Sequence, residues 1–315
     1  LKLLAPSLGR MVSEASTRRI QALSGHMCPS STCSRASLTS PSSKVLQSSI
    51  SSAEPANLQK KVCLVLGAGA GVGGHAAARF AKEGYHAVLV RRSDQDGLQK
   101  LVADIEATCG HGSASGVMMN AAEADSIEKL VDRVEAERGP IHVLIFNLGA
   151  QIGNKALQET SLKQFELGWR MAVFALFRVA KCVCPLMEKR GGGTILVTSA
   201  TAAMRGNSGQ HSHAAAMGGR RLLCQTLNAE WAKKGIHVAH VLIDGSVDAP
   251  DTLGRMLGAE KFEQLRNSVG GSKDGLVMPV HVAETYWHLH CQPRSTQTFE
   301  LDLRSFRDVA WWNHQ

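Results

Sequence analysis

The stretch VLGAGAGVGG, residues 65–74, decides the fold. Gly67, Gly71 and Gly73 follow a short apolar run and precede a segment with the apolar spacing of a helix. Glycine at these positions permits a tight turn between a strand and a helix, and it lets the backbone approach a pyrophosphate at the helix N-terminus. The motif is weak alone, but here the strand and the helix that it needs lie on either side of it. The stretch therefore predicts a dinucleotide-binding fold.

Strand and helix patterns alternate along the rest of the chain. Helices are expected at residues 72–84, 95–108, 126–138, 162–190 and 213–235, with two more before the last strand; strands are expected at residues 60–67, 86–90, 114–119, 141–147, 194–199, 236–243 and 299–303. Such alternation is typical of a parallel sheet with helices on both faces. We therefore expect an α/β protein: a Rossmann-type, doubly wound, seven-stranded parallel sheet in one domain over residues 58–315.

Two arginines end the second expected strand. Arg91 and Arg92 stand where an NAD-binding protein would place an acid against the ribose 2′-hydroxyl. Guanidinium groups bind a phosphate through paired hydrogen bonds, whereas an acid would repel it. The pattern therefore indicates NADP(H) as the cofactor; the alternative is that the two arginines are simply solvated at a strand end.

The composition narrows the function classes. The chain has 315 residues, a charged fraction of 20% and a formal net charge of +8, and it carries no apolar run of the roughly 20 residues that a membrane-spanning helix needs. No basic helix with interleaved aromatic residues points to nucleic acid as the main partner. The eight cysteines form no C-x-x-C pair, so we expect buried thiols in a reducing compartment.

Residues 1–57 differ in composition from the rest. This arm is rich in Ser, with six basic and two acidic residues, a net charge of +4. Such a composition is typical of a mitochondrial (matrix-side) targeting region, or of a plastid one, or of a disordered tail. Because the sequence begins with Leu1, we expect it to be processed or incomplete. We expect the arm to contact other protein subunits of a large assembly, or anionic lipid.

With these motifs in place, residues 58–304 resemble the short-chain dehydrogenase/reductase family. The glycine loop matches, and "FNLG" at residues 146–149 looks like the family's N-N-A-G motif. Asn120 takes the place of an aspartate near the adenine, and Asp244-Gly245 takes the place of the family's Pro-Gly pair on the nicotinamide side. The residues expected to contact NADP(H) are Gly67, Gly69, Gly71, Val72, Gly73, Arg91, Arg92, Asn120, Asn147, Gly149 and Gly245.

The resemblance also implies a catalytic tetrad of Asn, Ser, Tyr and Lys. All four positions are changed in this sequence, to Ala172, Ala200, His213 and Met217 respectively. Neither tyrosine, Tyr85 nor Tyr286, stands in a position that the family uses, and Ser199 is expected to point away from the position of Ala200. His213 is the only weak candidate for a catalytic residue, since histidine can donate a proton near neutral pH.

No metal site is expected. His211 and His213 are two residues apart at the start of a helix, so their side chains point to different faces, and no carboxylate or cysteine follows at ligand spacing. "HLHC" at residues 288–291 has the same weakness.

Three functions remain open on this basis. The changed tetrad and the arm favour a catalytically inactive accessory subunit of a larger, mitochondrial assembly, such as respiratory complex I, that holds NADP(H). The alternative is an active NADP-dependent short-chain oxidoreductase with non-standard catalytic residues. A nucleotide-responsive sensor is a third possibility. Whether the long helices pair two copies of the chain into a homodimer stays open.

Overall fold

The computed structural model describes residues 60–149, 154–270 and 273–313. The expectations for the arm, residues 1–57, lie outside the described residues. In the described part of the chain, no helix is long and apolar enough to cross a membrane.

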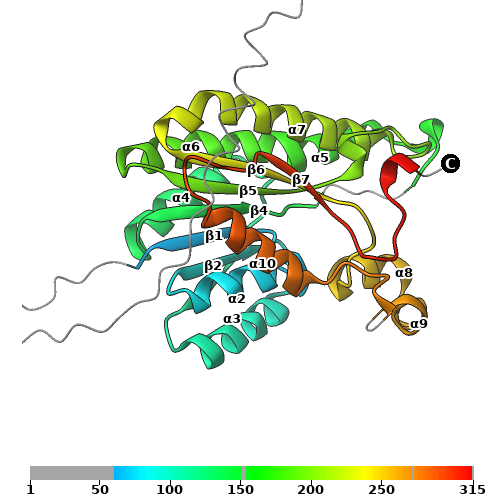
Figure 1. The fold of residues 1–315 in the computed structure, drawn as a ribbon, viewed down its shortest axis with the longest axis horizontal. Helices are drawn as coiled ribbons and strands as arrows, with labels where there is room; N and C mark the ends of the chain where they lie inside the picture. Colours follow the sequence, from blue (N-terminus) through cyan, green and yellow to red (C-terminus); the bar gives the residue numbers. More distant parts are fainter. Residues whose placement is uncertain (1–59, 150–153, 271–272, 314–315) are drawn as a thin grey trace, which may run out of the picture. The chain divides into compact units, whose positions relative to one another are not determined.

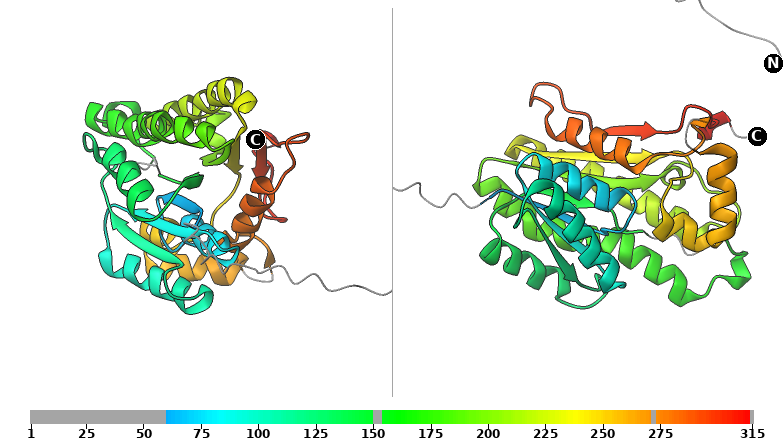
Figure 2. Two further views of the ribbon diagram at one scale, coloured as in Figure 1. Left: turned by 90° about the vertical axis from the view of Figure 1, so that its left-hand side faces the viewer. Right: turned by 90° about the horizontal axis from the view of Figure 1, so that it is seen from below.

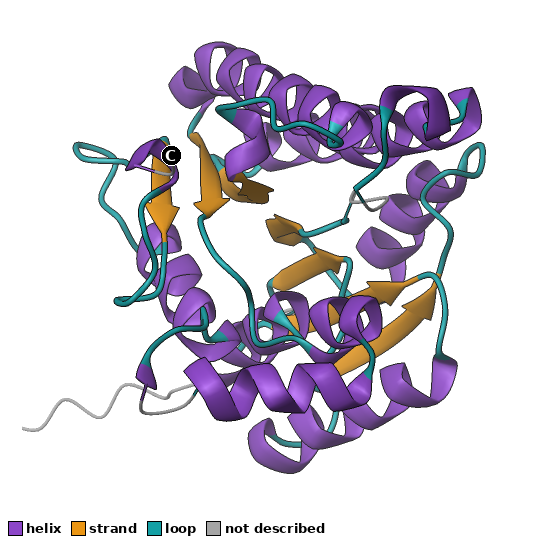
Figure 3. Ribbon diagram, turned by 90° about the vertical axis from the view of Figure 1, so that its right-hand side faces the viewer, coloured by secondary structure: helices purple, strands orange, loops and turns teal. Residues whose placement is uncertain are grey.

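Seven parallel strands form one sheet, as predicted (Figure 1). Their order is β3-β2-β1-β4-β5-β6-β7, so the chain turns back between β1 and β4. In such sheets a ligand binds outside the carboxyl ends of the strands at this reversal point. Figure 3 shows the sheet from the side at which the strands end. The strands are β1 (Val62–Leu66), β2 (His86–Arg91), β3 (Ala114–Met118), β4 (Ile141–Phe146), β5 (Gly193–Ala200), β6 (Ile236–Ile243) and β7 (Glu300–Leu303).

Alternating side chains of the strands build a core on each face of the sheet. On β1, Cys63 and Val65 face one core, while Val62, Leu64 and Leu66 face the other. The first core is covered by α2 (Val72–Lys82), α3 (Gln95–Cys109) and α10 (Pro279–His290), and the second by α4 (Ser126–Glu137), α6 (Ala175–Lys189) and α7 (His211–Trp231) (Figure 2). Because both faces of the sheet are covered at its centre, β1 is apolar and buried along its whole length.

The segment expected as one long helix is divided by a π-helical turn. Helix α5 (Leu162–Trp169) runs into a π turn at Arg170–Phe174, and α6 follows without a break in the helical path. Single π turns inside α-helices occur often at functional sites. This turn contains Ala172, one of the four tetrad positions. The apolar spacing of the sequence does not distinguish a π turn from an α-helical one, so it was not predicted.

Two short helices follow β6. A π turn at Pro250–Gly254 leads into α8 (Arg255–Leu257), and α9 (Ala259–Val269) comes next. They lie beyond the carboxyl end of β6 (Figure 1). This segment brings residues far along the chain back to the side of the sheet where the glycine loop lies.

Candidate nucleotide and active site

The glycine loop packs against the end of β4. Gly67 has a positive φ of 95°, and a Cβ there would lie 2.6 Å from the carbonyl oxygen of Asn147. The Asn147 side chain donates a hydrogen bond of 2.8 Å to the Gly67 carbonyl oxygen. A Cβ on Gly73 would lie 2.3 Å from the same carbonyl oxygen. The structure therefore brings together these three predicted residues, and it explains why two of them are glycine.

The other two glycines of the loop face a segment that follows β6. A Cβ on Gly71 would lie 2.9 Å from Cβ of Ala249, and one on Gly69 would lie 2.9 Å from Oδ2 of Asp251. The backbone N–H of Ala70 donates a hydrogen bond of 2.9 Å to this same carboxylate oxygen. A carboxylate of the chain itself therefore accepts a hydrogen bond from one backbone N–H of the loop. Asp251 was not predicted as a site residue, because 181 residues separate it from Ala70.

Arg91 lies between two carboxylates. Its Nη2 is 3.0 Å from Oδ2 of Asp251 and 3.0 Å from Oδ2 of Asp94. Asp94 also caps α3 by accepting a hydrogen bond of 2.9 Å from the Gly97 N–H. Arg92, the second predicted ribose-reading residue, is exposed. The two arginines are therefore not equivalent, since Arg91 already has anionic partners.

The remaining predicted contacts are spread around this edge of the sheet. Val72 is buried as the first residue of α2, so it offers the site its backbone rather than its side chain. Asn120 follows β3 and is bonded within its own turn, to Glu123 and to the Ala122 N–H. Gly149 is exposed, just after Asn147.

Apolar packing fills most of the tetrad positions. Ala172, Ala202, Ala216 and Met217 form a small buried cluster, with Ala200 packed against it. The Met217 side chain is only 2% exposed, and its sulfur lies 3.9 Å from the Ser199 hydroxyl oxygen. Ser199 therefore points into the packing beneath α7. These positions offer no polar group to a substrate.

His213 differs from the other three positions. It is the third residue of α7, in the first turn of the helix, and it is half-buried. The two tyrosines are used elsewhere: the Tyr286 hydroxyl is hydrogen-bonded to that of Thr198 at 2.6 Å, and the Tyr85 hydroxyl to the His290 ring at 2.8 Å. The prediction that neither tyrosine takes a family position is consistent with these contacts.

Arg220 is a buried cation next to the tetrad positions, and sequence analysis did not single it out. It is 2% exposed, and burial lowers the pKa of its guanidinium to about 10. All three guanidinium nitrogens donate to backbone carbonyls: Nε to Ala172 at 3.1 Å, Nη1 to Thr198 at 2.7 Å and Nη2 to Leu148 at 2.8 Å. Arg220 thus joins α7 to the ends of β4 and β5 and to the π turn. A charged residue seven positions after His213, on the same helix face, was the available signal.

The Asp244-Gly245 pair holds the C-terminal segment against the end of β6. Gly245 has a φ of 146°. The buried Asp244 carboxylate accepts a hydrogen bond of 3.0 Å from the Trp311 N–H and lies 3.2 Å from Nε of Arg304. Arg205, which follows β5, donates a hydrogen bond of 2.6 Å to the Trp311 carbonyl oxygen. Residues near the C-terminus therefore contribute to this end of the sheet.

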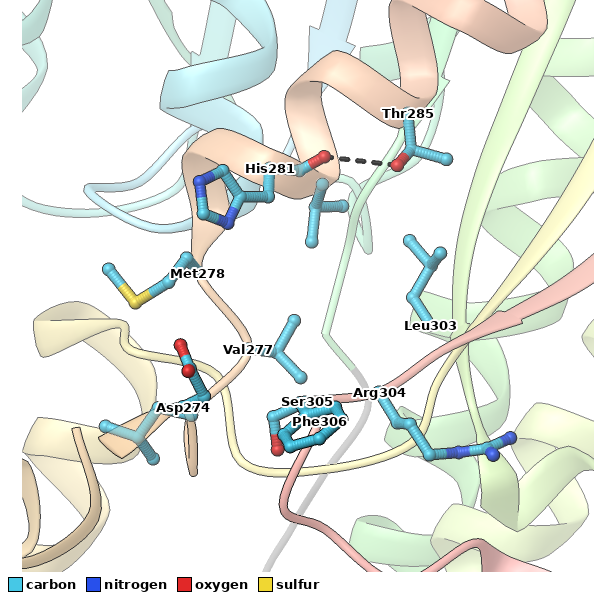
Figure 4. Close-up of a pocket in the computed structure, with 11 residues that line it drawn as sticks. Asp274, Val277, Met278, His281, Thr285, Leu303, Arg304, Ser305 and Phe306 are labelled. Carbon is cyan, nitrogen blue, oxygen red and sulfur yellow. Dashed lines mark hydrogen bonds between the residues drawn. The ribbon is translucent and has the colours of Figure 1, made fainter. Parts of the chain in front are cut away.

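A cavity of about 220 Å³ lies at the first turns of α10 (Figure 4). It is lined by the end of β7, by residues 276–278 and by His281, Val282 and Thr285 of α10. None of the predicted nucleotide contacts lines it, so we do not assign the active site to it. Within the described residues, no group of three or more His, Cys, Asp or Glu side chains could hold a metal ion.

Comparisons with known proteins identify relatives with named activities. The chain is 30% identical over 192 residues to the uncharacterized oxidoreductase YuxG of Bacillus subtilis. This match covers 60% of this chain but only 27% of YuxG. It is 31% identical over 235 residues to the short-chain reductase protein NovJ of Streptomyces niveus, covering 74% of this chain and 87% of NovJ. Its fold is similar to actinorhodin polyketide ketoreductase with NADPH, at a TM-score of 0.67, 25% identity and coverage of 78% and 96%.

These relatives contradict the expectation of a catalytically inactive accessory subunit. The similar proteins are named as an oxidoreductase, a reductase and a ketoreductase. The expectation was wrong because it rested on the four changed positions and on the arm. The loss of the family's four catalytic side chains does not show which other side chains take over their roles.

The family assignment rests on a match to most of the folded chain. The model of the short chain dehydrogenases matches residues 61–250. This range contains the glycine loop, Asn147, the tetrad positions and the loop of Asp244 and Gly245. The chain belongs to the short-chain dehydrogenase/reductase family.

Proposed function

We propose that this protein is an active NADP(H)-dependent short-chain oxidoreductase whose proton donor is not the family's tyrosine. The family membership and the activities named for the relatives support this reading. The solved ketoreductase with a similar fold carries NADPH, which agrees with the cofactor expected from the sequence.

One observation carries the proposal: the glycine loop already binds an anion. The Ala70 N–H and Arg91 hold the Asp251 carboxylate at 2.9 and 3.0 Å. A phosphate oxygen presents the same chemistry to these donors. The adjoining N-terminus of α2 carries no acidic residue in its first turn, so its dipole is free to favour a second anionic group. NADP(H), when bound, supplies the hydride.

The chain's own part in a carbonyl reduction is to deliver a proton to the substrate oxygen. We assign this step to His213, which stands in the family's tyrosine position on α7 and is the only ionisable residue among the four tetrad positions. The imidazolium donates the proton from a ring nitrogen and becomes neutral imidazole. Met217 and Ala172 are buried and apolar, so they exclude water beneath the helix without taking part in proton transfer.

Turnover by purified protein tests the proposal. NADPH oxidation is followed with a panel of aldehydes, ketones and quinones for the wild type and for His213→Ala. His211→Ala is the matched control, because it removes an imidazole from the same helical turn, about 200° around the axis.

We expect the wild type to oxidise NADPH with at least one class of carbonyl. His213→Ala should lower kcat by about 10²- to 10⁴-fold, the usual contribution of a positioned acid, while His211→Ala stays near wild type. Nucleotide binding without turnover on any carbonyl would refute the activity. Equal rates for wild type and His213→Ala would refute the assignment of the proton donor.

A further inference from the structure

Asp251 joins the two parts of the glycine-loop site. One of its oxygens, Oδ2, accepts from the Ala70 N–H at 2.9 Å and lies 3.0 Å from Nη2 of Arg91. Ala70 belongs to the loop that approaches the phosphates, and Arg91 ends β2, where the ribose is read. A single carboxylate oxygen therefore lies between these two donors. An anionic group on the adenosine ribose of a bound nucleotide would occupy the same place.

Asp94 and Asp251 hold Arg91 in different ways. Asp94 is fixed by a second role, because its other oxygen caps α3 through the Gly97 N–H. Asp251 bonds only Arg91 and Ala70 among the residues that the structure describes. Asp251 is therefore the group that an incoming anion can displace at lower cost.

The backbone around Asp251 is built from an uncommon turn. Asp251 is the second residue of the π-helical segment Pro250–Gly254, which starts directly after Ala249. The segment lies close on the loop, since a Cβ on Gly71 would come 2.9 Å from Cβ of Ala249. π-helical turns are rare and short, and they are found mostly at functional sites. We therefore expect displacement of the carboxylate to shift this turn.

We propose that Asp251 determines cofactor selectivity by occupying the subsite of the nucleotide 2′-phosphate. This inference rests on the proposed function, because it assigns a role within the same nucleotide site. A 2′-phosphate must replace the carboxylate at Ala70 and Arg91, since the two anions would repel each other there. A nucleotide with a 2′-hydroxyl leaves the carboxylate in place. Asp251 thus weakens the binding of NADP(H) and leaves that of NAD(H) nearly unchanged.

The test compares the dissociation constants of NADPH and NADH for the wild type and Asp251→Asn, by calorimetry on the full chain. The matched control is Glu135→Gln. Like Asp251, Glu135 accepts a backbone N–H at 2.9 Å, from Ile141, and pairs with an arginine, Arg190. Glu135 is on α4 and contacts the amino end of β4, which is about 16 Å along the strand from its carboxyl end.

We expect Asp251→Asn to tighten NADPH binding by about 5- to 10-fold, as if the open site rose from a minor to the major population. NADH binding should change by less than about twofold, and Glu135→Gln should change neither constant by more than that. Unchanged or weaker NADPH binding in Asp251→Asn overturns the inference. Equal tightening of both nucleotides overturns the assignment to the 2′-phosphate subsite. If no protein binds either nucleotide, the proposed function fails together with the inference.

Hydrogen exchange of the wild type gives a second readout that needs no variant. The probes are 2′,5′-ADP, which carries the 2′-phosphate, and 5′-ADP, which lacks it. We expect 2′,5′-ADP to speed exchange of the amides of residues 251–254, and 5′-ADP to leave it unchanged. Faster exchange with both probes, or with neither, counts against a carboxylate displaced by the 2′-phosphate.

Discussion

Replacing Arg220 should destabilise the protein strongly. The guanidinium is fully buried and donates to the carbonyls of Ala172, Thr198 and Leu148 at 2.7 to 3.1 Å. A hydrogen bond to a charged group contributes about 1.5–3 kcal/mol. Lysine has a single ammonium group and cannot reproduce the planar fork, so Arg220→Lys should lose two of the three contacts. The expected cost is about 3–6 kcal/mol in the free energy of unfolding.

Arg220→Met removes the positive charge together with the hydrogen bonds, whereas Arg220→Lys keeps the charge. Comparing the two variants separates the two contributions to stability. Methionine leaves all three carbonyls without their donor, but it also removes a cation that has no carboxylate partner among the residues that the structure describes, which offsets part of the cost. We therefore expect Arg220→Met to be no less stable than Arg220→Lys. The control is Arg221→Met, which breaks a partly exposed ion pair with Glu300 and should cost about 1 kcal/mol or less.

Thermal and urea unfolding measure these changes. A loss of 3 kcal/mol corresponds to a fall in Tm of about 6–12 °C for a domain of this size. The NADPH dissociation constant of each variant, measured well below its Tm, reports whether the ends of β4 and β5 have moved. If Arg220→Lys is within about 1 kcal/mol of wild type, the three carbonyls do not depend on the guanidinium fork, and the reasoning is refuted.

Three further predictions follow from single residues. Gly73→Ala should lower the free energy of unfolding by more than about 2 kcal/mol and abolish NADPH binding, because its Cβ would lie 2.3 Å from the Gly67 carbonyl oxygen. Gly218→Ala is the control, since a Cβ there would meet open space. Equal unfolding curves for the two variants would contradict this prediction. Burial lowers the pKa of His240 to about 4, below its unfolded value of about 6.5, so the unfolded state binds the proton first and stability falls by about 3 kcal/mol from pH 7 to pH 4. Urea unfolding of wild type and His240→Asn across that range should show a smaller loss in the variant, and an equal loss would argue against a neutral buried imidazole. Burial raises the pKa of Cys224 to about 12, so mass spectrometry should find it unmodified by iodoacetamide at pH 8 until the protein unfolds; rapid modification of the native protein would contradict this burial.

The elements that were predicted are those whose signals are local. The apolar run of β1, the glycines after it and the spacing of α2 lie within about twenty residues. Gly67 and Asn147 were both expected at the cofactor site, Asn147 through the family motif rather than through any local pattern, but their contact with each other was not predicted. The sequence therefore contained most of the fold and the cradle for the cofactor.

The residues that were missed depend on contacts between distant parts of the chain. Asp251 meets Ala70 across 181 residues, and Arg220 meets Leu148 across 72. Neither pairing follows from periodicity or composition, because an aspartate and a helical arginine are ordinary in any sequence. The expectation of an inactive subunit was wrong for the same reason. It used the residue types at the four tetrad positions without the side chains that the fold places around them.

Transfer of deuterium to a carbonyl substrate from NADPH that carries two deuterium atoms at C4 shows whether the protein catalyses hydride transfer. Mass spectrometry of the alcohol measures whether the label reaches the carbon. We expect labelled product with wild-type protein and with His211→Ala, and a rate lower by about 10²-fold or more with His213→Ala. Unlabelled product throughout the panel of aldehydes, ketones and quinones would contradict it, as would labelled product formed at the wild-type rate by His213→Ala.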